Sequence, residues 1–436
     1  MLPVPRQSQR LRVSGRAIAT VLVAFGVAGV LQAAPAQASV APIAPAFFGV
    51  HHQGLHADGP IGFPQTTVGS VRMWDNKVSW RELETSPGVF DWSLIDAQMA
   101  KARANGASVL LVLGQTPRFH STRPDTPSTS TYGAGASAMP RKAAWVRYVR
   151  EVALRNRTVW GGIASFQVWN ESNVSAYWSG TPQQMATLTQ WTDAALRSAD
   201  ASAQLVAPAM VTRLISQRAW INAFYSQRVS GRNVSSYVDA LSFQLYPAAN
   251  GSPESSMALL RAVRVVLARH RVTKPIWNTE VNYGLVGGPG AGAEARPAPT
   301  SRQVSNVVRT YVLNAQNRVA RVYWYSFDLL RMSDTALVAP DRVTLTAAGR
   351  AFTTTRLWLL GTRPSGCSTD RAGTYTCVFR SGSQVRRVVW NPGKRVAVRA
   401  PKGTTALSTS DGATRPARAG TRVYVGQVPI LFRGSR

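Results

Sequence analysis

Eight short apolar runs with helix-like segments between them are the feature that most restricts the fold of this chain. The runs lie at residues 45–50, 67–74, 107–114, 163–169, 203–209, 238–246, 274–280 and 319–327. Several are continuously apolar, as expected of parallel strands covered by helices. Two of the helical segments begin with a capping residue followed by proline, at Thr181 and at Ser252. Eight strands that alternate with helices predict an α/β fold, the (β/α)8 TIM barrel.

The first strand-to-helix unit is the weakest part of this pattern. No clear helix lies between Val50 and Val68, so we expect the first helix to be short or irregular. An open, doubly wound sheet is the structural alternative. However, no G-x-G-x-x-G or phosphate-loop sequence follows any of the eight runs, so this alternative lacks its usual signature.

The pattern changes in the last part of the chain. Short β-rich runs separated by Gly, Pro, Asn and Ser occupy residues 356–436 and predict a small all-β sandwich domain. Its Cys367 and Cys377 are separated by nine residues, which favours a short-loop disulfide. We therefore expect a barrel domain at residues 39–355 followed by this β-domain.

Residues 1–38 have the features of a secretory signal peptide. Four arginines precede an apolar run at residues 17–31, which is too short to span a bilayer comfortably. An A-x-A sequence then ends at Ala38, so we expect cleavage near Ala38 and a secreted protein without a transmembrane segment. An uncleaved membrane anchor is the alternative.

The chain is strongly basic. It has 50 Lys and Arg against 20 Asp and Glu, and removing the four signal-peptide arginines leaves 46 − 20 = +26. Residues 356–436 alone contain 15 basic and two acidic residues, a charge of +13. Such a surface attracts polyanions, among them acidic polysaccharides, an anionic cell envelope and nucleic acid. An arginine-rich proteome would give the same composition. Because no nucleic-acid-binding motif is present, we expect no specific nucleic-acid partner.

Ligands of a parallel barrel meet the C-terminal ends of its strands. The polar and aromatic residues that we expect there are His52, Arg72, Trp74, Gln115, Asn170, Glu171, Trp178, Tyr246, Glu280 and Trp324. Two of them are carboxylates. A pair of carboxylates can hydrolyse a glycosidic bond, because one acid protonates the leaving oxygen while the other attacks the anomeric carbon. Each acid could instead be paired with an arginine for structural reasons.

The other residues of this set suit a sugar ligand. Trp and Tyr rings stack on the apolar faces of sugars, and Asn, Gln, Arg and His side chains pair with the hydroxyl groups. The histidines at positions 51, 52 and 56 could suggest a metal, but a rim or packing role is favoured. We therefore expect neither a metal nor another cofactor.

Three segments resemble motifs of clan A glycoside hydrolases. "VWNESN" is similar to their strand-four W-N-E-P-N motif, with Ser172 in place of proline, and "IWNTEVNYG" is similar to their strand-seven T-E nucleophile motif. The segment "VRMWDNKVSWRELETSPGVFDWSLID" resembles family 39, which includes β-xylosidase-like and exopolysaccharide-cleaving enzymes. The resemblance covers roughly residues 45–360.

The resemblance implies a role for six residues. Glu171 would be the acid/base and Glu280 the nucleophile of a retaining mechanism through a covalent glycosyl-enzyme. The implied supporting roles are a sugar-hydroxyl ligand at Asn170, a hydrogen bond to the nucleophile from Tyr246, electrostatic support from Arg72 and a subsite floor at Trp324. Many relatives have histidine where this chain has Gln244, which leaves the role of that position open.

The expected protein is thus a secreted, monomeric glycosidase that acts on a polysaccharide or oligosaccharide. The charge favours an acidic or envelope-associated glycan, and a β-xyloside is the alternative that the family implies. Two other functions remain open. One is a catalytically silent protein that binds carbohydrate or cell envelope through the same barrel. The other is a basic envelope- or nucleic-acid-binding protein that uses the barrel as a scaffold.

Overall fold

The computed structural model describes residues 41–56, 66–129, 132–284, 296–328 and 333–435. The predicted signal peptide lies outside the described residues. No helix in the described part of the chain is long and apolar enough to cross a bilayer.

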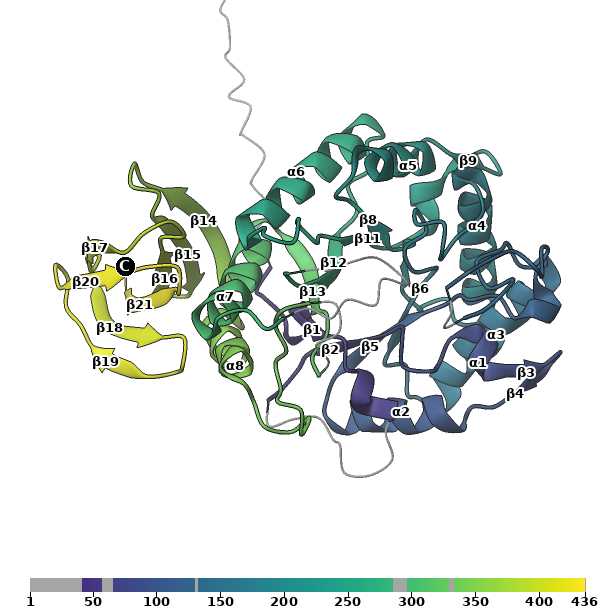
Figure 1. The fold of residues 1–436 in the computed structure, drawn as a ribbon, viewed down its shortest axis with the longest axis horizontal. Coiled ribbons are helices and arrows are strands. Elements are labelled where there is room, and N and C mark those ends of the chain that lie inside the picture. The colour runs from purple at the N-terminus through teal and green to yellow at the C-terminus, as the bar shows by residue number, and fades with distance from the viewer. Residues whose placement is uncertain (1–40, 57–65, 130–131, 285–295, 329–332, 436) are drawn as a thin grey trace, which may run out of the picture. The chain divides into compact units, whose positions relative to one another are not determined.

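The first described part is a parallel sheet that closes into a barrel (Figure 1). Its strands are β1 (Phe48–Val50), β2 (Ser70–Met73), β5 (Ser108–Val112), β6 (Ala164–Gln167), β7 (Leu205–Val206), β8 (Met210–Val211), β11 (Leu241–Gln244), β12 (Ile276–Val281) and β13 (Val319–Trp324). β7 and β8 are two parts of the fifth strand. β7 pairs with β6, β8 pairs with β11, and a bridge from Val206 to Ala240 joins the two edges. The predicted (β/α)8 barrel is therefore confirmed, and the sheet is not open.

Helices connect the strands. They are α1 (Trp80–Leu83), α2 (Ser93–Ala104), α3 (Lys142–Thr158), α4 (Pro182–Ala199), α5 (Ile215–Tyr225), α6 (Pro253–Arg269), α7 (Thr300–Gln316) and α8 (Ala347–Leu359). The predicted caps are present, because Thr181 accepts a hydrogen bond from the Gln184 amide and Ser252 from the Ser255 amide. After β1, the described residues contain one 3-10 turn, Gln53–His56, where the sequence predicts a short or irregular first helix.

Side chains inside the barrel follow the two-residue period of its strands. Tyr323 of β13 lies in a buried interior cluster with Leu110 and Trp277. A Cβ atom on Gly49 would lie only 2.6 Å from the Tyr323 ring, so residue 49 of β1 must be glycine for this ring to fit. The period then turns residues 51 and 325 toward the barrel axis and the residues beside them away from it.

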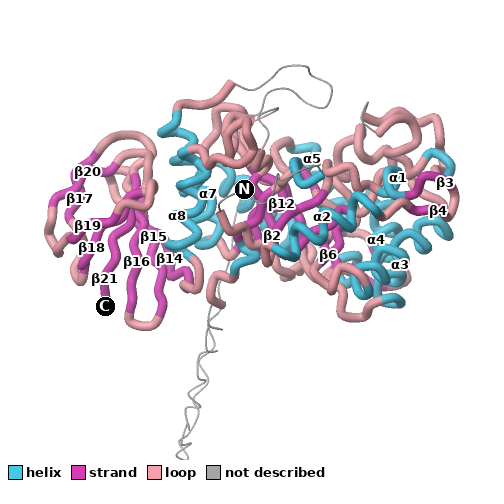
Figure 2. The backbone as a smooth tube through the Cα atoms, turned by 90° about the horizontal axis from the view of Figure 1, so that it is seen from below, coloured by secondary structure: helices cyan, strands magenta, loops and turns pink. Residues whose placement is uncertain are grey.

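The last part of the chain is antiparallel. One sheet contains, in spatial order, β14 (Arg363–Thr369), β15 (Tyr375–Ser381), β16 (Gln384–Trp390), β21 (Ile430–Ser435), β18 (Thr404–Thr409) and β19 (Thr414–Pro416). β17 (Val396–Arg399) and β20 (Arg422–Val425) form a separate two-stranded ribbon, and Figure 2 shows all of these strands in magenta. Cys367 and Cys377 lie opposite each other on β14 and β15 and form the predicted disulfide. α8 ends at Leu359, slightly beyond the predicted domain boundary.

Two short strand pairs and three 3-10 turns complete the described part of the barrel domain. The pairs are β3 (Glu84–Ser86) with β4 (Val89–Phe90) and β9 (Arg228–Val229) with β10 (Arg232–Asn233). The remaining 3-10 turns are Pro45–Phe47, Arg118–His120 and Val234–Tyr237. They contribute none of the predicted site residues.

Candidate active site

Arg72 is the centre of a hydrogen-bond network at the C-terminal ends of the strands. Its side chain is fully buried in the barrel, at the end of β2. One terminal nitrogen lies 2.5 Å from Glu280 Oε1 and 3.3 Å from His51 Nε2. The other donates to Asn170 Oδ1 at 2.8 Å, and Nε donates to Gln167 Oε1 at 2.8 Å. A single guanidinium therefore connects the ends of the second, fourth and seventh barrel strands, which lie far apart in the sequence.

Glu280, near the end of β12, is the acid with charged and polar partners. Besides Arg72, it accepts a hydrogen bond from Tyr246 Oη at 3.1 Å, the contact that the family resemblance implies. Burial raises the pKa of Glu280 to about 7, and Asp75 also raises it, whereas Arg72 and the Tyr246 hydroxyl lower it. Its two partners favour the ionised form, as a carboxylate that attacks an electrophile requires.

Glu171 is the acid without such partners. It follows β6, and no side-chain hydrogen bond or ion pair to its carboxylate is present among the described residues. Burial, and secondly the charge of Glu280, raises the pKa of Glu171 to about 8. Because the charge of Glu280 acts on Glu171, the two carboxyl groups lie in the same site. Without a cation or hydrogen-bond donor beside it, Glu171 is the member of the pair whose surroundings favour the protonated form.

The backbone fixes Glu171 in an uncommon conformation. Its φ of +42° lies in the left-handed region, which non-glycine residues seldom adopt. Hydrogen bonds to the fifth strand hold the chain on both sides of Glu171, since Ala209 N donates to Trp169 O at 2.8 Å and Ser172 N donates to Ala209 O at 2.9 Å. The chain therefore turns at Glu171 between two anchored residues. The second anchor needs a backbone N–H at position 172, which Ser172 supplies and the proline of the family motif would lack.

Asn170 and Gln244 complete the polar layer beside the acids. Asn170 Oδ1 accepts from Arg72 and, at 3.1 Å, from Gln244 Nε2. These two bonds fix the amide orientation and leave Nδ2 as a donor without a partner among the described residues. Gln244, whose role the sequence leaves open, thus orients Asn170.

Asp75 is a residue of this site that the sequence reasoning missed. It follows β2, and its Oδ2 accepts hydrogen bonds from Tyr325 Oη, at 2.9 Å, and from Gln53 Nε2. Its Oδ1 is buried and has no partner among the described residues. Burial raises the pKa of Asp75, and its charge in turn raises the pKa of Glu280. The sequence does contain a signal for Asp75, since it is an acid close to the end of a predicted strand, three residues after Arg72.

Trp324 does not floor the site, which corrects the prediction. It is fully buried on the outer side of β13, where its ring packs against Tyr283 and its Nε1 donates to Thr335 O at 3.3 Å. Tyr325 faces the site instead, where it contacts Asp75 and lies 5.0 Å from the His51 ring. The physical reason is the two-residue strand period, which puts adjacent residues on opposite faces.

Trp178 and His52 are two further corrections. Trp178 is 2% exposed and packs edge-on against Trp169 in the main core, so its ring is not available to a sugar. His52 is fully buried and contacts Asp328 Oδ2 at 3.3 Å and the Phe327 ring. The neighbouring His51 is the histidine that reaches the Arg72 network.

Trp74 and Gln115 lie near the network but do not contact it. Trp74 is 5% exposed and its ring packs against Tyr132 and Tyr177. Gln115 is fully buried, and neither end of its amide has a hydrogen-bond partner in the part of the chain that the structure describes. A role of these two residues in sugar binding stays a prediction.

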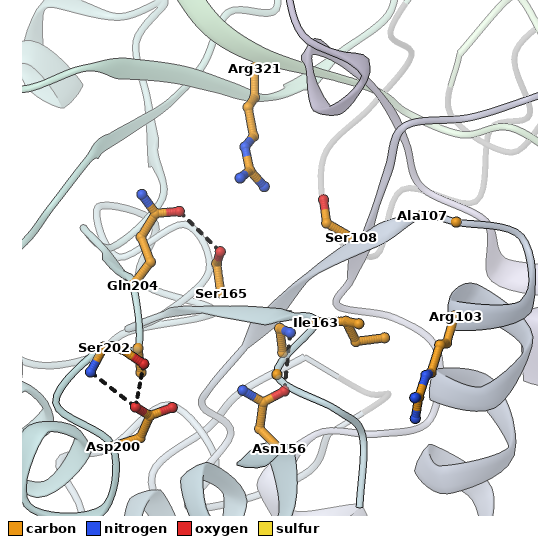
Figure 3. Close-up of a pocket in the computed structure, with 14 residues that line it drawn as sticks. Arg103, Ala107, Ser108, Asn156, Ile163, Ser165, Asp200, Ser202, Gln204 and Arg321 are labelled. Atoms are coloured by element: carbon orange, nitrogen blue, oxygen red, sulfur yellow. Dashed lines mark hydrogen bonds between the residues drawn. The ribbon is translucent and has the colours of Figure 1, made fainter.

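A cavity of about 480 Å³ lies at the opposite end of the barrel (Figure 3). Its lining includes Ser108, Ser165 and Gln204, at the N-terminal ends of their strands, and the Arg321 guanidinium points into it. None of the predicted site residues lines it. Within the described ranges, moreover, no group of three or more His, Cys, Asp or Glu could hold a metal ion.

A family model for the glycosyl hydrolase catalytic core matches residues 144–355, a range that includes both acids. This chain is a glycosidase. The enzyme class predicted from the strand-end acids is thereby confirmed. A search of curated protein sequences finds no match.

Solved structures of glycosidases share the fold of this enzyme. A family 39 β-xylosidase from Caulobacter crescentus is 16% identical, with a TM-score of 0.65 over 92% of this chain and 98% of that one. A family 30 endoxylanase from Clostridium papyrosolvens C71 is 14% identical, with a TM-score of 0.59 over the same shares. A family 51 arabinofuranosidase from Xanthomonas axonopodis pv. citri is 10% identical, with a TM-score of 0.58, again over 92% and 98%. The predicted family 39-like fold is therefore confirmed.

Proposed function

We propose that this glycosidase retains the anomeric configuration of its substrate, with Glu280 as nucleophile and Glu171 as acid/base. The observation that supports this assignment is the unequal environment of the two acids. Glu280 is held by Arg72 and Tyr246, whereas Glu171 lacks a partner and has the higher pKa. Glu280 is then ionised while Glu171 is protonated. Cleavage of a glycosidic bond requires one carboxyl group in each of these states.

In the first step, a Glu280 oxygen forms a bond to the anomeric carbon as the bond to the leaving oxygen breaks. Glu171 gives its proton to that oxygen. In the second step, Glu171 removes a proton from water, the water oxygen attacks the anomeric carbon, and Glu280 leaves as a carboxylate. Asn170, oriented by Arg72 and Gln244, donates Nδ2 to a hydroxyl of the bound sugar.

The substrate is a polysaccharide or an oligosaccharide. Similar folds occur in a β-xylosidase and in an arabinofuranosidase, so 4-nitrophenyl xylosides and arabinofuranosides are suitable first substrates. We expect the enzyme to be active as a monomer. A monomeric β-xylosidase has a similar fold, with a TM-score of 0.66 to this chain.

Azide rescue tests the two roles separately. In Glu171→Ala, azide replaces water as a nucleophile that needs no base, so it should restore turnover of an aryl glycoside and give a glycosyl azide of the substrate's own configuration. In Glu280→Ala, azide should occupy the place of the carboxylate and give the opposite configuration. Proton NMR of the products distinguishes the two outcomes.

A matched control is Glu151→Ala, since Glu151 is an exposed glutamate on α3. This variant should keep wild-type turnover without azide. Equal turnover by the wild type and by Glu280→Ala would refute the nucleophile assignment. Binding of a glycan without any turnover by the wild type would favour the catalytically silent alternative.

The protein acts outside the cell after removal of its first 38 residues. The N-terminal arginines, the apolar run and the A-x-A sequence support this part of the proposal. N-terminal sequencing of the protein recovered from the culture medium should begin at Ser39. Recovery of the intact N-terminus from the membrane fraction would show an uncleaved anchor instead.

A further inference from the structure

The basic charge of the β-domain is not balanced within the domain. Apart from Arg363, no Lys or Arg described between residues 360 and 435 forms an ion pair with a carboxylate. The two acids of the domain are engaged locally, since Asp370 accepts from the Thr374 amide and Asp411 from Thr409. No carboxylate of the described chain therefore pairs with these cations.

The two-stranded ribbon β17–β20 collects part of this charge on one face. Val396 and Val398 of β17 and Val423 and Val425 of β20 point inward and pack in the second hydrophobic core. The alternate residues point outward, and these are Arg395, Ala397, Arg399, Arg422 and Tyr424. We call Arg395, Arg399, Arg422 and Tyr424 the ribbon patch.

Cation–π contacts build this patch around one aromatic ring. The guanidinium groups of Arg395 and Arg422 lie 4.8 Å and 5.4 Å from the centre of the Tyr424 ring, and Tyr424 is still 52% exposed. Arg422 is directly opposite Arg399 in the ladder. Like charges opposite each other destabilise a strand pair, so this pairing is not explained by folding.

These features fit an anionic polymer better than a single small anion. Guanidinium groups bind carboxylate and sulfate groups through paired hydrogen bonds, and the exposed ring offers a surface for the C–H face of a sugar. From Arg395 to Arg399 the patch extends about 13 Å along the strand, at roughly 3.3 Å per residue. One sugar unit does not span this distance.

The β-domain contacts both ends of α7, and one of these contacts lies at the end of the barrel where the acids lie. Trp390 Nε1 donates to Glu254 Oε1 at 3.0 Å, and Gln427 Nε2 donates to Ser301 Oγ at 3.1 Å. Glu254 and Ser301 are in the first turns of α6 and α7, the helices that follow the C-terminal ends of β11 and β12. Gln427 comes two residues after β20, so the ribbon begins close to this end of the barrel.

We propose that the ribbon patch binds an acidic polysaccharide and holds it near the catalytic end of the barrel. This inference rests on the proposed glycosidase function, because a glycan is the polymer on which the attached barrel acts. Single-stranded nucleic acid is less well matched, since its recognition uses successive aromatic platforms and the ribbon exposes a single ring.

The test measures binding to three soluble polymers in affinity electrophoresis. They are polygalacturonate, dextran sulfate and neutral xylan, and an oligo-deoxythymidine serves as the nucleic-acid probe. All proteins contain Glu280→Ala, so that no hydrolysis occurs during the measurement. The ribbon variant combines Arg395→Gln, Arg399→Gln and Arg422→Gln, and Tyr424→Ala is tested separately.

The matched control removes the same charge from the barrel. It combines Arg228→Gln, Arg232→Gln and Arg271→Gln, three exposed arginines, one of which also stacks on a tyrosine, Tyr237. We expect the ribbon variant to lose tenfold or more in affinity for polygalacturonate, and Tyr424→Ala to lose at least threefold. The control should lose less than twofold, and neutral xylan should not bind through the patch.

Equal losses in the ribbon variant and the control would overturn the proposal, because unspecific charge would then explain binding. Tighter binding of the oligo-deoxythymidine, abolished in the ribbon variant, would identify a nucleic-acid surface instead. Preference for dextran sulfate over polygalacturonate would identify sulfate rather than carboxylate as the recognised group and support the patch. Turnover of aryl glycosides by the wild-type chain is measured separately, so failure of the proposed function is distinguishable from failure of this site.

Discussion

Arg72→Met is the substitution that tests the site most directly. The guanidinium is fully buried and makes four contacts, to Glu280, Asn170, Gln167 and His51. Breaking a buried ion pair by removing one partner costs about 3–5 kcal/mol. Spread over an unfolding entropy of about 0.8 kcal/mol per kelvin for a chain of about 400 residues, this corresponds to a Tm lower by roughly 4–6 °C.

The loss also depends on pH. Arg72 lowers the pKa of Glu280, so its removal raises that pKa further above the value of about 4.3 for an exposed glutamate. An acid whose pKa is raised by folding destabilises the native state as the pH rises between the two values. The Tm deficit of the variant should therefore be small at pH 5 and largest at pH 8.

The same shift should appear in catalysis. The acidic limb of the kcat/KM profile for an aryl glycoside should move to higher pH by about one unit or more, each unit being about 1.4 kcal/mol. At the optimum, kcat/KM should fall by about 10²–10³, the usual result of removing one preorganised donor. Scanning fluorimetry and initial rates between pH 5 and pH 9 measure both effects.

Arg309→Met is the matched control. Arg309 is also buried in an ion pair, with Glu254, but contacts no residue of the Arg72 network. It should lower the Tm by a similar amount and leave the acidic limb in place. A Tm deficit of Arg72→Met that is the same at pH 5 and pH 8, or an acidic limb that does not move, would refute the electrostatic reasoning.

Three further outcomes are expected. In the wild type, kcat/KM should be highest between about pH 7 and pH 8, because Glu280 must be ionised and Glu171 protonated; an optimum below pH 5 would contradict this order of pKa values. Asp75→Asn removes a charge that raises the pKa of Glu280, so the acidic limb of the kcat/KM profile should move to lower pH and KM should rise. An unchanged pH profile would show that Asp75 does not influence Glu280. Trp324→Phe should lower the free energy of unfolding by about 1–3 kcal/mol, as expected for lost core packing, and should keep kcat/KM within twofold of the wild-type value. A hundredfold loss of kcat/KM would instead indicate that Trp324 contacts the sugar.

The predictions that succeeded rest on local signals. Thr181–Pro182 and Ser252–Pro253 begin helices because a side-chain oxygen and a proline stabilise a first turn wherever they occur together. The position of Glu280 near the end of its strand follows from the apolar run that precedes it, since parallel strands in a barrel end on the same side. Both features depend on residues close together in the chain.

The predictions that failed concern the direction of a side chain. A shift of one residue moves a strand side chain to the opposite face, and the sequence "VYWY" offers an aromatic residue for either phase. Only the packing of Tyr323 against Gly49 inside the barrel fixes the phase that buries Trp324 and turns Tyr325 toward Asp75. The burial of Trp178 likewise depends on its contact with Trp169, which the sequence does not show.

The sequence by itself determined the eight barrel strands, the two strand-end acids and the disulfide, since each depends on a periodicity or a short spacing. Only the tertiary structure decided which neighbours those acids have. Asp75 reaches Tyr325 across 250 positions, and Arg72 reaches Glu280 across 208. The chemistry of the site follows from these long-range contacts, because the pKa of a carboxylate depends on its burial and on the charges beside it, not on its place in the chain.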